Sequence, residues 1–417
     1  MNTDQVTRLR GSAVFFMALA AALGTSTLYT LQPAIADVAE SLSSQITAVG
    51  VALACGPAGY MAGLALLVPL VDRFAPSRVL AAQFAVLAVA LAASSASAGV
   101  VTLGALTAVA GACSAVGAGL SSVAGRLAPA PRRATVLGIV TAGISAGILA
   151  GRIAGGWLAD EIGWRATLLA FAAACAAVAT GCLLLVPSTR SGTGLRYGET
   201  LRSLPGLFVR HAVLRLAAIR GALWFFAFCT LWSGLAVVLS QPPHSYSAER
   251  IGLYALAGVS GIFATRIAGA WTDRAGARRV ILLGLAMAGT AAVVIGWSLT
   301  STAATLVCLV LFDAGLFAAQ VANQSTVLAI DPTAPARFNS AYMLVYFIGG
   351  SLGTAFGAVT AAQLGRPATT AIIAAAIGAA AALTVFTRMS RLHGMKPSPT
   401  VEGHDRDHFH PVQPGAR

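Results

Sequence analysis

Charged residues are scarce in this chain of 417 residues. They make up 10% of it, against about 25% in an ordinary soluble domain, and apolar residues make up 57%. A soluble fold of this length would not cover its surface with so few charges. Apolar runs near the roughly 20 residues that cross a bilayer recur from end to end. The sequence therefore excludes the soluble classes and predicts an all-α membrane protein with many spans.

Lysine is almost missing, since Lys396 is the only one. The formal net charge of +13 is therefore nearly all arginine. These arginines stand in short loops and at the ends of apolar runs, which is where membrane proteins carry positive charge on their cytoplasmic side. The charge indicates contact with the lipid bilayer, and no nucleic-acid partner is expected.

The motifs of enzymes and of metal sites are missing too. The six cysteines lie inside apolar runs without a Cys-x-x-Cys pair, where cysteine behaves as a small apolar residue. No phosphate-binding loop and no paired-histidine metal motif occurs. We therefore expect no enzyme activity, no cofactor and no metal.

Twelve apolar segments are expected to be transmembrane helices, because a helix satisfies its own backbone groups in hydrocarbon. An even number of spans places both termini on one side. One set of loops carries arginine and the alternate set is nearly free of it, so both termini are expected in the cytoplasm. The expected spans are 12–34, 46–71, 78–97, 99–125, 134–158, 164–186, 214–240, 248–271, 279–298, 301–326, 338–363 and 367–387.

The same reasoning divides the chain into five parts. A short cytoplasmic N-terminus (1–11) precedes a first bundle of six helices (12–186). A cytoplasmic linker (187–213) leads to a second bundle of six (214–387), and a polar tail (388–417) follows. The linker is basic and amphipathic, so it either lies along the anionic inner leaflet or is a solvated connection. The tail contains histidines that a metal would accept, but its composition favours disorder.

A charged hairpin occurs once in each half of the chain. The second copy contains Gly269, Asp273, Arg274, Gly276, Arg278 and Arg279; the first, about half a chain earlier, contains Asp72, Arg73 and Arg78. The halves also share Gln32-Pro33 and Gln241-Pro242 at the ends of corresponding spans. Matched landmarks in the same order predict two similar, parallel halves.

These hairpins resemble the signature of the major facilitator superfamily, Gly-x3-Asp-Arg-x-Gly-x-Arg-Arg. The second copy matches it at all six of its residues, whereas the first has Val68 and Ala75 where the glycines belong. The resemblance covers about residues 12–387. It implies two pseudo-symmetric bundles of six helices, alternating access to a site between them, and hairpins that close the cytoplasmic side.

The fifth span contains glycines at four-residue spacing. They form one flat face that lets two helix backbones approach closely, and they are Gly143, Gly147, Gly151, Gly155 and Gly156. This span resembles the glycine-rich motif of antiporters in the superfamily, although Arg152 stands where those proteins usually have proline. Tyr29-x2-Gln32-Pro33 and Asp160-x3-Trp164-Arg165 also resemble its bacterial drug- and sugar-efflux branch. The resemblance implies export.

Charged residues inside spans are candidates for function, because each costs roughly 2.5–3.5 kcal/mol at the bilayer centre. Asp313, in the tenth span, is the candidate proton carrier, and a structural role bonded to a neighbouring helix is the alternative. Arg152 and Arg220 would bind an anionic group or pair with Asp313, unless they extend to the interface. Gln320 and Asn323 share a helix face, and Trp224 and Phe228 would bind an apolar or aromatic substrate or only pack.

Together these features predict a secondary transporter of the bacterial inner membrane, functional as a monomer, that exports a small organic molecule in exchange for protons. The alternative within the same class is an uptake permease for a small organic anion, which would use Arg152 and Arg220. A non-transporting sensor on the same scaffold is the alternative from another class.

Overall fold

The structure is a computed structural model that describes residues 11–129, 132–187, 205–299, 301–331 and 335–386. Every regular element within these ranges is helical. The first half contains α1 (Gly11–Ser26), α2 (Ile35–Ser41), α3 (Ile46–Leu66), α4 (Leu70–Arg73), α5 (Pro76–Ser95), α6 (Val100–Ser114), α7 (Val116–Leu127) and α8 (Arg133–Leu185). The second half contains α10 (Ala212–Ser240), α11 (Ala248–Leu253), η2 (Tyr254–Gly258), α12 (Val259–Ala275), α13 (Ala277–Ser298), α14 (Thr302–Leu328), α15 (Pro335–Gln363) and α16 (Gly365–Phe386). Residues 205–210 are also helical.

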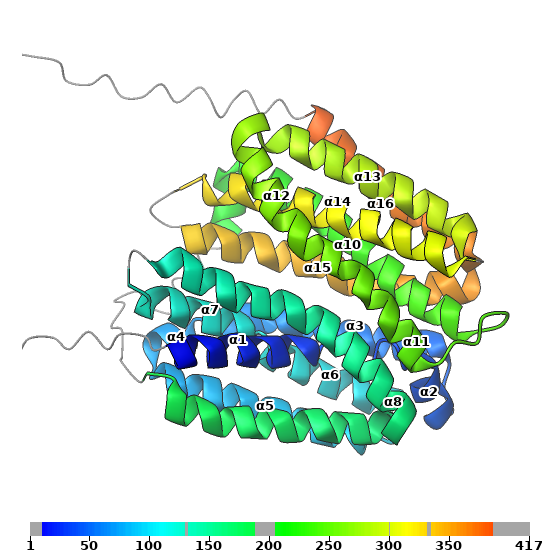
Figure 1. Cartoon of the computed structure of the whole chain (residues 1–417), viewed down its shortest axis with the longest axis horizontal. Coiled ribbons are helices and arrows are strands. Elements are labelled where there is room, and N and C mark those ends of the chain that lie inside the picture. Colours follow the sequence, from blue (N-terminus) through cyan, green and yellow to red (C-terminus); the bar gives the residue numbers. More distant parts are fainter. Residues whose placement is uncertain (1–10, 130–131, 188–204, 300, 332–334, 387–417) are drawn as a thin grey trace, which may run out of the picture.

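Within the described ranges, ten helical segments are long and apolar enough to cross a membrane, when α6 with α7 (100–127) and α11 through α12 (248–275) are each counted as one. One of them, α8, contains both spans expected at 134–158 and 164–186. At Gly163 its backbone has φ +80°, a conformation that glycine adopts without steric cost. The chain turns back there, so the two arms of α8 run in opposite directions (Figure 1). The shorter apolar helix α1 has 16 residues.

The helices form two groups that follow the two halves of the sequence. Helices α1 to α8 lie together on one side of the molecule and α10 to α16 on the other (Figure 1). Within the first group α8 packs on α1 and α5, and α3 packs on α6; within the second, α10 packs on α15 and α13 on α14. The main contact between the groups joins α3 to α15, and a second joins α8 to α11.

Glycine ladders bring equivalent helix pairs together in both halves. A Cβ atom on Gly143, Gly147, Gly151 or Gly155 of α8 would collide with the backbone of α1 and the turns after it, at Ala18, Ala22, Ser26 or Thr30. A Cβ atom on Gly349, Gly353 or Gly357 of α15 would collide in the same way with α10 at Ala222, Phe226 or Thr230. Such close approach of two backbones is what small residues at four-residue spacing allow. The internal repeat thus extends from sequence to packing.

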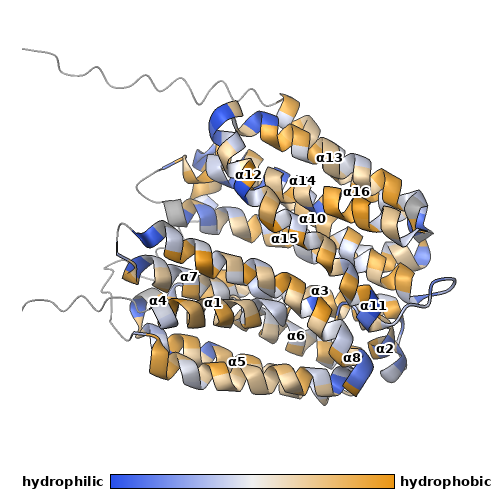
Figure 2. Cartoon of the chain, in the orientation of Figure 1, coloured by the Kyte–Doolittle hydropathy of each residue, from blue (hydrophilic) through white to orange (hydrophobic). Residues whose placement is uncertain are grey.

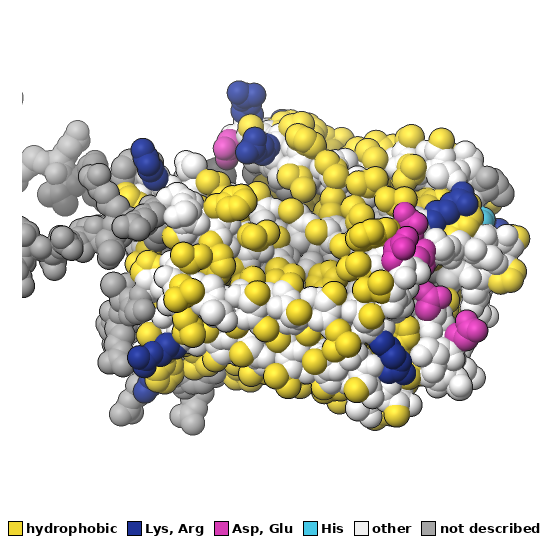
Figure 3. Space-filling view, turned by 60° about the horizontal axis from the view of Figure 1, so that its bottom comes forward, with side chains coloured by type: hydrophobic (Ala, Val, Ile, Leu, Met, Phe, Trp, Pro, Cys, Tyr) yellow, Lys and Arg dark blue, Asp and Glu magenta, His cyan; other side chains and the backbone are white. Residues whose placement is uncertain are grey.

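The two ends of the bundle carry different charges. One end, called the acidic end, holds Asp37, Glu40, Asp160, Glu161 and Glu249; the other, called the arginine-rich end, holds Arg73, Arg78, Arg126, Arg274 and Arg279. Figure 2 shows apolar residues along the bodies of the helices and polar ones near their ends. Figure 3 shows acidic side chains gathered at one end of a largely apolar surface. This surface suits a protein that lies across hydrocarbon.

The halves are joined toward the acidic end. There Asp160 of α8 accepts hydrogen bonds from the backbone N–H groups of Ala248 (3.0 Å) and Glu249 (2.9 Å) at the start of α11. A carboxylate at a helix N-terminus satisfies free N–H donors and complements the helix dipole. Further along, the Ser351 hydroxyl donates to the carbonyl oxygen of Ala54 at 2.8 Å and so ties α15 to α3.

Four expected spans are less regular than the sequence suggested. The segment 12–34 is helical only to Ser26 and continues in turns through Pro33. The helix within 46–71 ends at Leu66, shortly before Pro69, which cannot donate to a helix. The segment 99–125 is divided into α6 and α7 at Ala115, and 248–271 into α11, η2 and α12. Most of the linker and all but the last residue of the N-terminus lie outside the described residues, as does the tail.

Candidate functional site

The first part of the candidate site surrounds Asp313, near the middle of α14. Its side chain is 1% exposed. The indole N–H of Trp232, on α10, donates to Asp313 Oδ1 at 3.3 Å. Its other oxygen faces the start of α12, where a Cβ atom on Gly258 would lie 3.1 Å from Oδ2. The carboxyl group is therefore held between elements of the second half, at the level where that half meets Leu149 of α8.

Arg152 approaches the same place from the first half. It is buried on α8, and its Nε donates to Oε1 of Gln32 at 2.8 Å. Its guanidinium carbon lies 4.2 Å from the ring centre of Trp232, 4.9 Å from that of Tyr29 and 5.7 Å from that of Phe228. Aromatic faces attract cations at these distances, and more strongly where water is excluded. Arg152 is thus stabilised by rings from both halves.

Trp232 stands between the two buried charges. One face of its ring meets Arg152, and its N–H binds Asp313. Among the described residues neither Arg152 nor Arg220 forms an ion pair with Asp313, so the direct pairing that the sequence suggested is absent from this conformation. The arrangement instead links a cation of one half to a carboxyl group of the other through a single indole. A change in the charge of Asp313 or of Arg152 would therefore alter the electrostatic interaction between the two halves.

A second polar cluster lies in the second half around Arg220, which is 3% exposed. Its Nη2 donates to Oδ1 of Asn323 at 2.9 Å. The Asn323 amide then donates to the carbonyl oxygen of Ala217 at 2.9 Å and to the Tyr342 hydroxyl at 3.3 Å. The Tyr342 hydroxyl in turn donates to Oε1 of Gln320 at 2.6 Å. Arg220 therefore does not extend to the interface; it begins a chain of hydrogen bonds inside the bundle.

A cavity of about 120 Å³ lies where these two clusters approach each other. Gln320, Trp224 and Phe228 line it, as the sequence suggested, whereas Arg152, Arg220 and Asn323 stand behind its wall. Seven of its ten lining residues are aromatic, and they come from both halves: Tyr29, Ile148, Trp224, Phe225, Phe228, Leu316, Phe317, Gln320, Tyr346 and Phe347. A concave, mostly apolar site with a few polar groups is the usual form of a small-molecule site.

Several of these residues were not identified from the sequence. Phe317, Tyr346 and Phe347 belong to long apolar runs, where an aromatic residue facing a cavity has the same pattern as one facing lipid. Tyr342 likewise has no sequence signal of its own. Gln32 stood out as part of the repeated Gln-Pro landmark and of the motif Tyr29-x2-Gln32-Pro33, but not as a site residue. Since its amide now holds Arg152, that landmark would have pointed to the site had it been considered together with a buried arginine.

The charged hairpins lie at the arginine-rich end, away from the cavity. In the second copy Gly276 has φ +85° between α12 and α13, and Arg278 donates to the carbonyl oxygens of Thr384 (3.3 Å) and Val385 (3.1 Å) at the end of α16. Asp273, Arg274 and Arg279 are exposed, and a Cβ atom on Gly269 would meet no other atom within 4 Å. In this conformation the second hairpin is hydrogen-bonded to α16, a helix of its own half, through Arg278.

The first hairpin is likewise hydrogen-bonded to a helix of its own half, α7. Arg126 of α7 donates from Nη2 to the carbonyl oxygen of Val71 at 2.9 Å. Arg73 and Arg78 are exposed, and the side chain of Asp72 lies outside the described part of the structure. Both copies of the hairpin thus have arginine-to-carbonyl bonds that fix helix ends.

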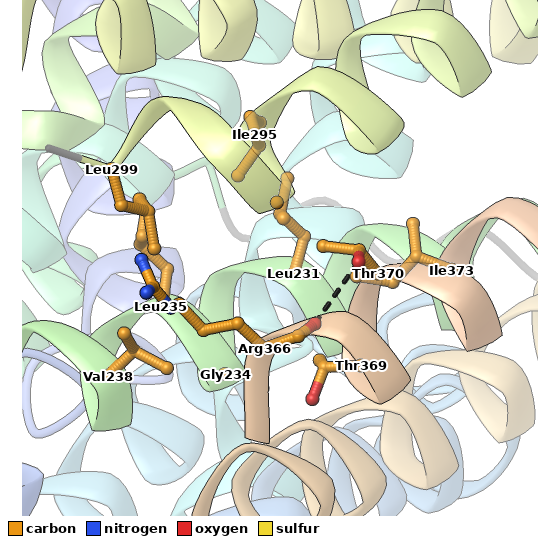
Figure 4. A pocket seen from close by; sticks show the side chains of 11 residues that line it. Leu231, Gly234, Leu235, Val238, Ile295, Leu299, Arg366, Thr369, Thr370 and Ile373 are labelled. Atoms are coloured by element: carbon orange, nitrogen blue, oxygen red, sulfur yellow. Dashed lines mark hydrogen bonds between the residues drawn. The ribbon is translucent and has the colours of Figure 1, made fainter. Parts of the chain in front are cut away.

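A second, smaller pocket lies between α10, α13 and α16 (Figure 4). Apolar side chains such as Leu231, Leu235 and Ile373 line it, with Arg366 across one side. Its volume is about 30 Å³, roughly that of one water molecule in the liquid. It is too small for an organic substrate, and the aromatic cavity is therefore the candidate binding site.

One carboxyl group at the acidic end has an altered proton affinity. The side chain of Asp37 on α2 is exposed, but its neighbours still remove part of its water. This desolvation first, and then the nearby carboxylates of Asp160 and Glu40, raise its pKa above the ordinary 3.8. Burial and like charges both disfavour the ionised form. Within the residues that the structure describes, no group of three or more histidine, cysteine, aspartate or glutamate side chains is placed to hold a metal ion.

Known proteins support a transporter of this architecture. The sequence model of the Major Facilitator Superfamily matches residues 14–354. An Escherichia coli O157:H7 protein described as the uncharacterized transporter YgaY is 31% identical over 352 residues, which are 84% of this chain and 89% of that protein. A Streptomyces coelicolor protein described as a probable transporter is 30% identical over 340 residues, 81% of this chain and 79% of that protein.

Solved structures share the fold at low sequence identity. A bacterial homologue of the human lysosomal transporter Spinster, in an inward-facing and unoccupied conformation, superposes with a TM-score of 0.71 at 16% identity, over 92% of this chain and 95% of that one. The nucleoside transporter NupG does so with a TM-score of 0.71 at 12% identity, over 89% and 98%. Together with the sequence match and the repeated helix packing, these likenesses show that the chain belongs to the Major Facilitator Superfamily.

Proposed function

We propose that this transporter exports a small organic molecule in exchange for protons, by alternating access to the aromatic cavity. The observation that carries the proposal is the series Arg152, Trp232 and Asp313, which crosses the junction of the two halves beside the cavity. A carboxyl group that gains or loses a proton there changes the charge facing Arg152. The balance between conformations that join or separate the halves would change with it.

The proposal includes the orientation and the number of spans. The arginine-rich end would face the cytoplasm, because short loops with arginine are retained there. Twelve spans would result from α1, the two arms of α8 and the remaining long helices, in two bundles of six. The halves meet at the acidic end, so this conformation would be the one open toward the cytoplasm.

The test is transport by the purified protein in liposomes with an imposed pH gradient. Labelled candidate compounds should accumulate in vesicles that are acidic inside if export is exchanged for protons. Accumulation in vesicles that are alkaline inside would instead indicate symport. That result would favour the alternative, an uptake permease for a small organic anion, which the buried Arg152 beside the cavity supports.

The role of Asp313 is tested by Asp313→Asn, which preserves the size and most of the hydrogen-bonding capacity of the side chain. We expect this variant to retain exchange of substrate between the two sides, which needs no net proton movement, and to lose accumulation driven by the pH gradient. If Asp313→Asn accumulated substrate as the unaltered protein does, protons would have to be coupled elsewhere.

A further inference from the structure

The cavity wall presents hydrogen-bond donors. Arg220 determines this, because it fixes the direction of donation along the hydrogen-bonded chain that ends at Gln320. A guanidinium group only donates, so Asn323 must turn its oxygen toward Arg220. Its NH2 group then points the other way and donates to Tyr342. Tyr342 consequently donates to the oxygen of Gln320. The NH2 group of Gln320 remains as the end of the chain at the cavity wall.

Trp224 supplies a second donor. It lines the same cavity and is 1% exposed, and its indole Nε1 has no hydrogen-bond partner among the described residues. Trp224 lies one helical turn beyond Arg220 on α10, so both belong to one face of that helix. An indole N–H donates and does not accept. Leaving such a buried group unpaired is costly, which favours a ligand that supplies an acceptor.

The charge and size of the cavity restrict the ligand further. Arg152 lies within 6 Å of the ring centres of two lining residues, Tyr29 and Phe228, and Arg220 stands at the far end of the donor chain. Against these two cations, the described part of the chain places one carboxyl group nearby, that of Asp313. The cavity volume of about 120 Å³ is near the roughly 150 Å³ of an apolar protein cavity that holds benzene. Its aromatic walls suit a flat ring.

We propose that the substrate is a compact aromatic molecule carrying a hydrogen-bond acceptor, best as a carboxylate, and that Trp224 and Gln320 are the donors that select it. This proposal rests on the aromatic cavity being the transport site. It names the substrate class by its chemistry: the ring occupies the aromatic walls, and the acceptor meets the two donors. A cationic ring compound should bind more weakly, because its ammonium group needs hydrogen-bond acceptors, whereas the cavity presents donors and lies near two arginines.

The test is calorimetric titration of the purified, detergent-solubilised full chain with four probes of similar size. Benzoate is an aromatic anion, benzyl alcohol is neutral, benzylammonium is a cation, and cyclohexanecarboxylate is an anion without an aromatic ring. We expect benzoate to bind most tightly, with an affinity at least about tenfold above that of benzylammonium. Equal or tighter binding of benzylammonium, or no preference for benzoate over cyclohexanecarboxylate, would overturn the proposal.

Two variants test the donors separately. Gln320→Glu replaces the NH2 donor by an acceptor of the same shape, and should reverse the preference between benzoate and benzylammonium. Trp224→Phe keeps a six-membered aromatic ring and removes the N–H together with the five-membered ring that carries it. It should weaken benzoate about tenfold, and more than it weakens toluene, a probe without an acceptor that reports the loss of ring area alone. The matched controls are Gln363→Glu and Trp297→Phe, at exposed positions of α15 and α13, which should bind benzoate as before.

Failure of this proposal differs from failure of the proposed function. Tight benzoate binding without flux driven by a pH gradient would leave the substrate class in place and remove proton exchange. Proton-driven flux of a cationic or non-aromatic compound would support proton exchange and remove the proposed substrate class. Elution and thermal unfolding of each variant show whether it is folded; should one donor variant not fold, the other still decides between the two outcomes.

Discussion

Tyr342 is the residue on which the orientation of the Gln320 amide depends. Its hydroxyl accepts from Asn323 and donates to Gln320, and its side chain is fully buried. The sequence identified three polar members of this chain, Arg220, Asn323 and Gln320, because polar residues are conspicuous in apolar spans. It did not identify Tyr342 as their connection, because contacts between residues on α10, α14 and α15 depend on how these helices pack.

Tyr342→Phe should therefore lower stability through buried groups that lose a partner. We expect the free energy of unfolding to fall by about 1–3 kcal/mol, because Gln320 Oε1 loses its donor and the Asn323 amide one acceptor. Thermal or detergent-induced unfolding of the purified protein measures the change. Tyr254→Phe is the matched control, since the buried Tyr254 hydroxyl makes one long bond, at 3.5 Å to Thr302. Equal losses in both variants would contradict this role of Tyr342.

Asp37 predicts a dependence of stability on pH at the acidic end. Its raised pKa means that the folded protein binds this proton more tightly than the unfolded chain does. The resulting stability is fully present below pH 3.8, the ordinary pKa, and is lost as pH rises through the raised value. Asp37→Asn, which cannot ionise, should therefore unfold at a higher temperature than the unaltered protein at pH 7.5, and the difference should shrink toward pH 4.

The control for this experiment is Glu161→Gln, which removes an exposed carboxylate at the same end of the bundle. It should change the unfolding temperature little at either pH, because an exposed charge interacts weakly in water. A stabilisation by Asp37→Asn that persisted undiminished at pH 4 would mean that the effect is not due to ionisation of Asp37.

At the scale of helices, the most predictable elements were the pairs that pack through glycine. The four-residue spacing on α8 predicts close backbone approach whatever the partner is, and the structure shows that α1 is the partner. The spans with internal breaks were less predictable. Nothing in the hydropathy of 248–271 distinguishes a continuous helix from α11, η2 and α12, because the hydrogen-bonding pattern of a helix changes there without a change in composition.

Gly147→Ala tests the packing of α8 on α1. The added methyl group would collide with the carbonyl oxygen of Ala22, so the helices must move apart, at a cost of about 1–3 kcal/mol in the free energy of unfolding. Gly138→Ala, on the same helix, meets no atom within 4 Å and should be neutral or stabilising by up to about 1 kcal/mol. Comparable unfolding curves for the two variants would show that this contact does not hold the helices together.

At the scale of the whole molecule, two similar bundles were predictable because the charged hairpin and other landmarks occur twice. How the bundles meet was not, since the contacts between them are few and depend on the conformation. Asp160 illustrates this point: the sequence showed it beside a span end, and the structure shows that it binds the start of α11 in the other half. Under the proposed alternating access, the joined acidic end would belong to one of the two states that the mechanism requires.

Alternating access is tested most directly by two distances measured in the same protein in liposomes. Spin labels at Ser41 and Glu249 report the acidic end, and labels at Arg73 and Arg274 report the arginine-rich end; all four positions are exposed and each pair spans the two halves. We predict that Asp160→Ala, which removes the two hydrogen bonds to the start of α11 at the acidic end, lengthens the first distance and shortens the second. Two distances that stay fixed, or that change in the same direction, would contradict the account.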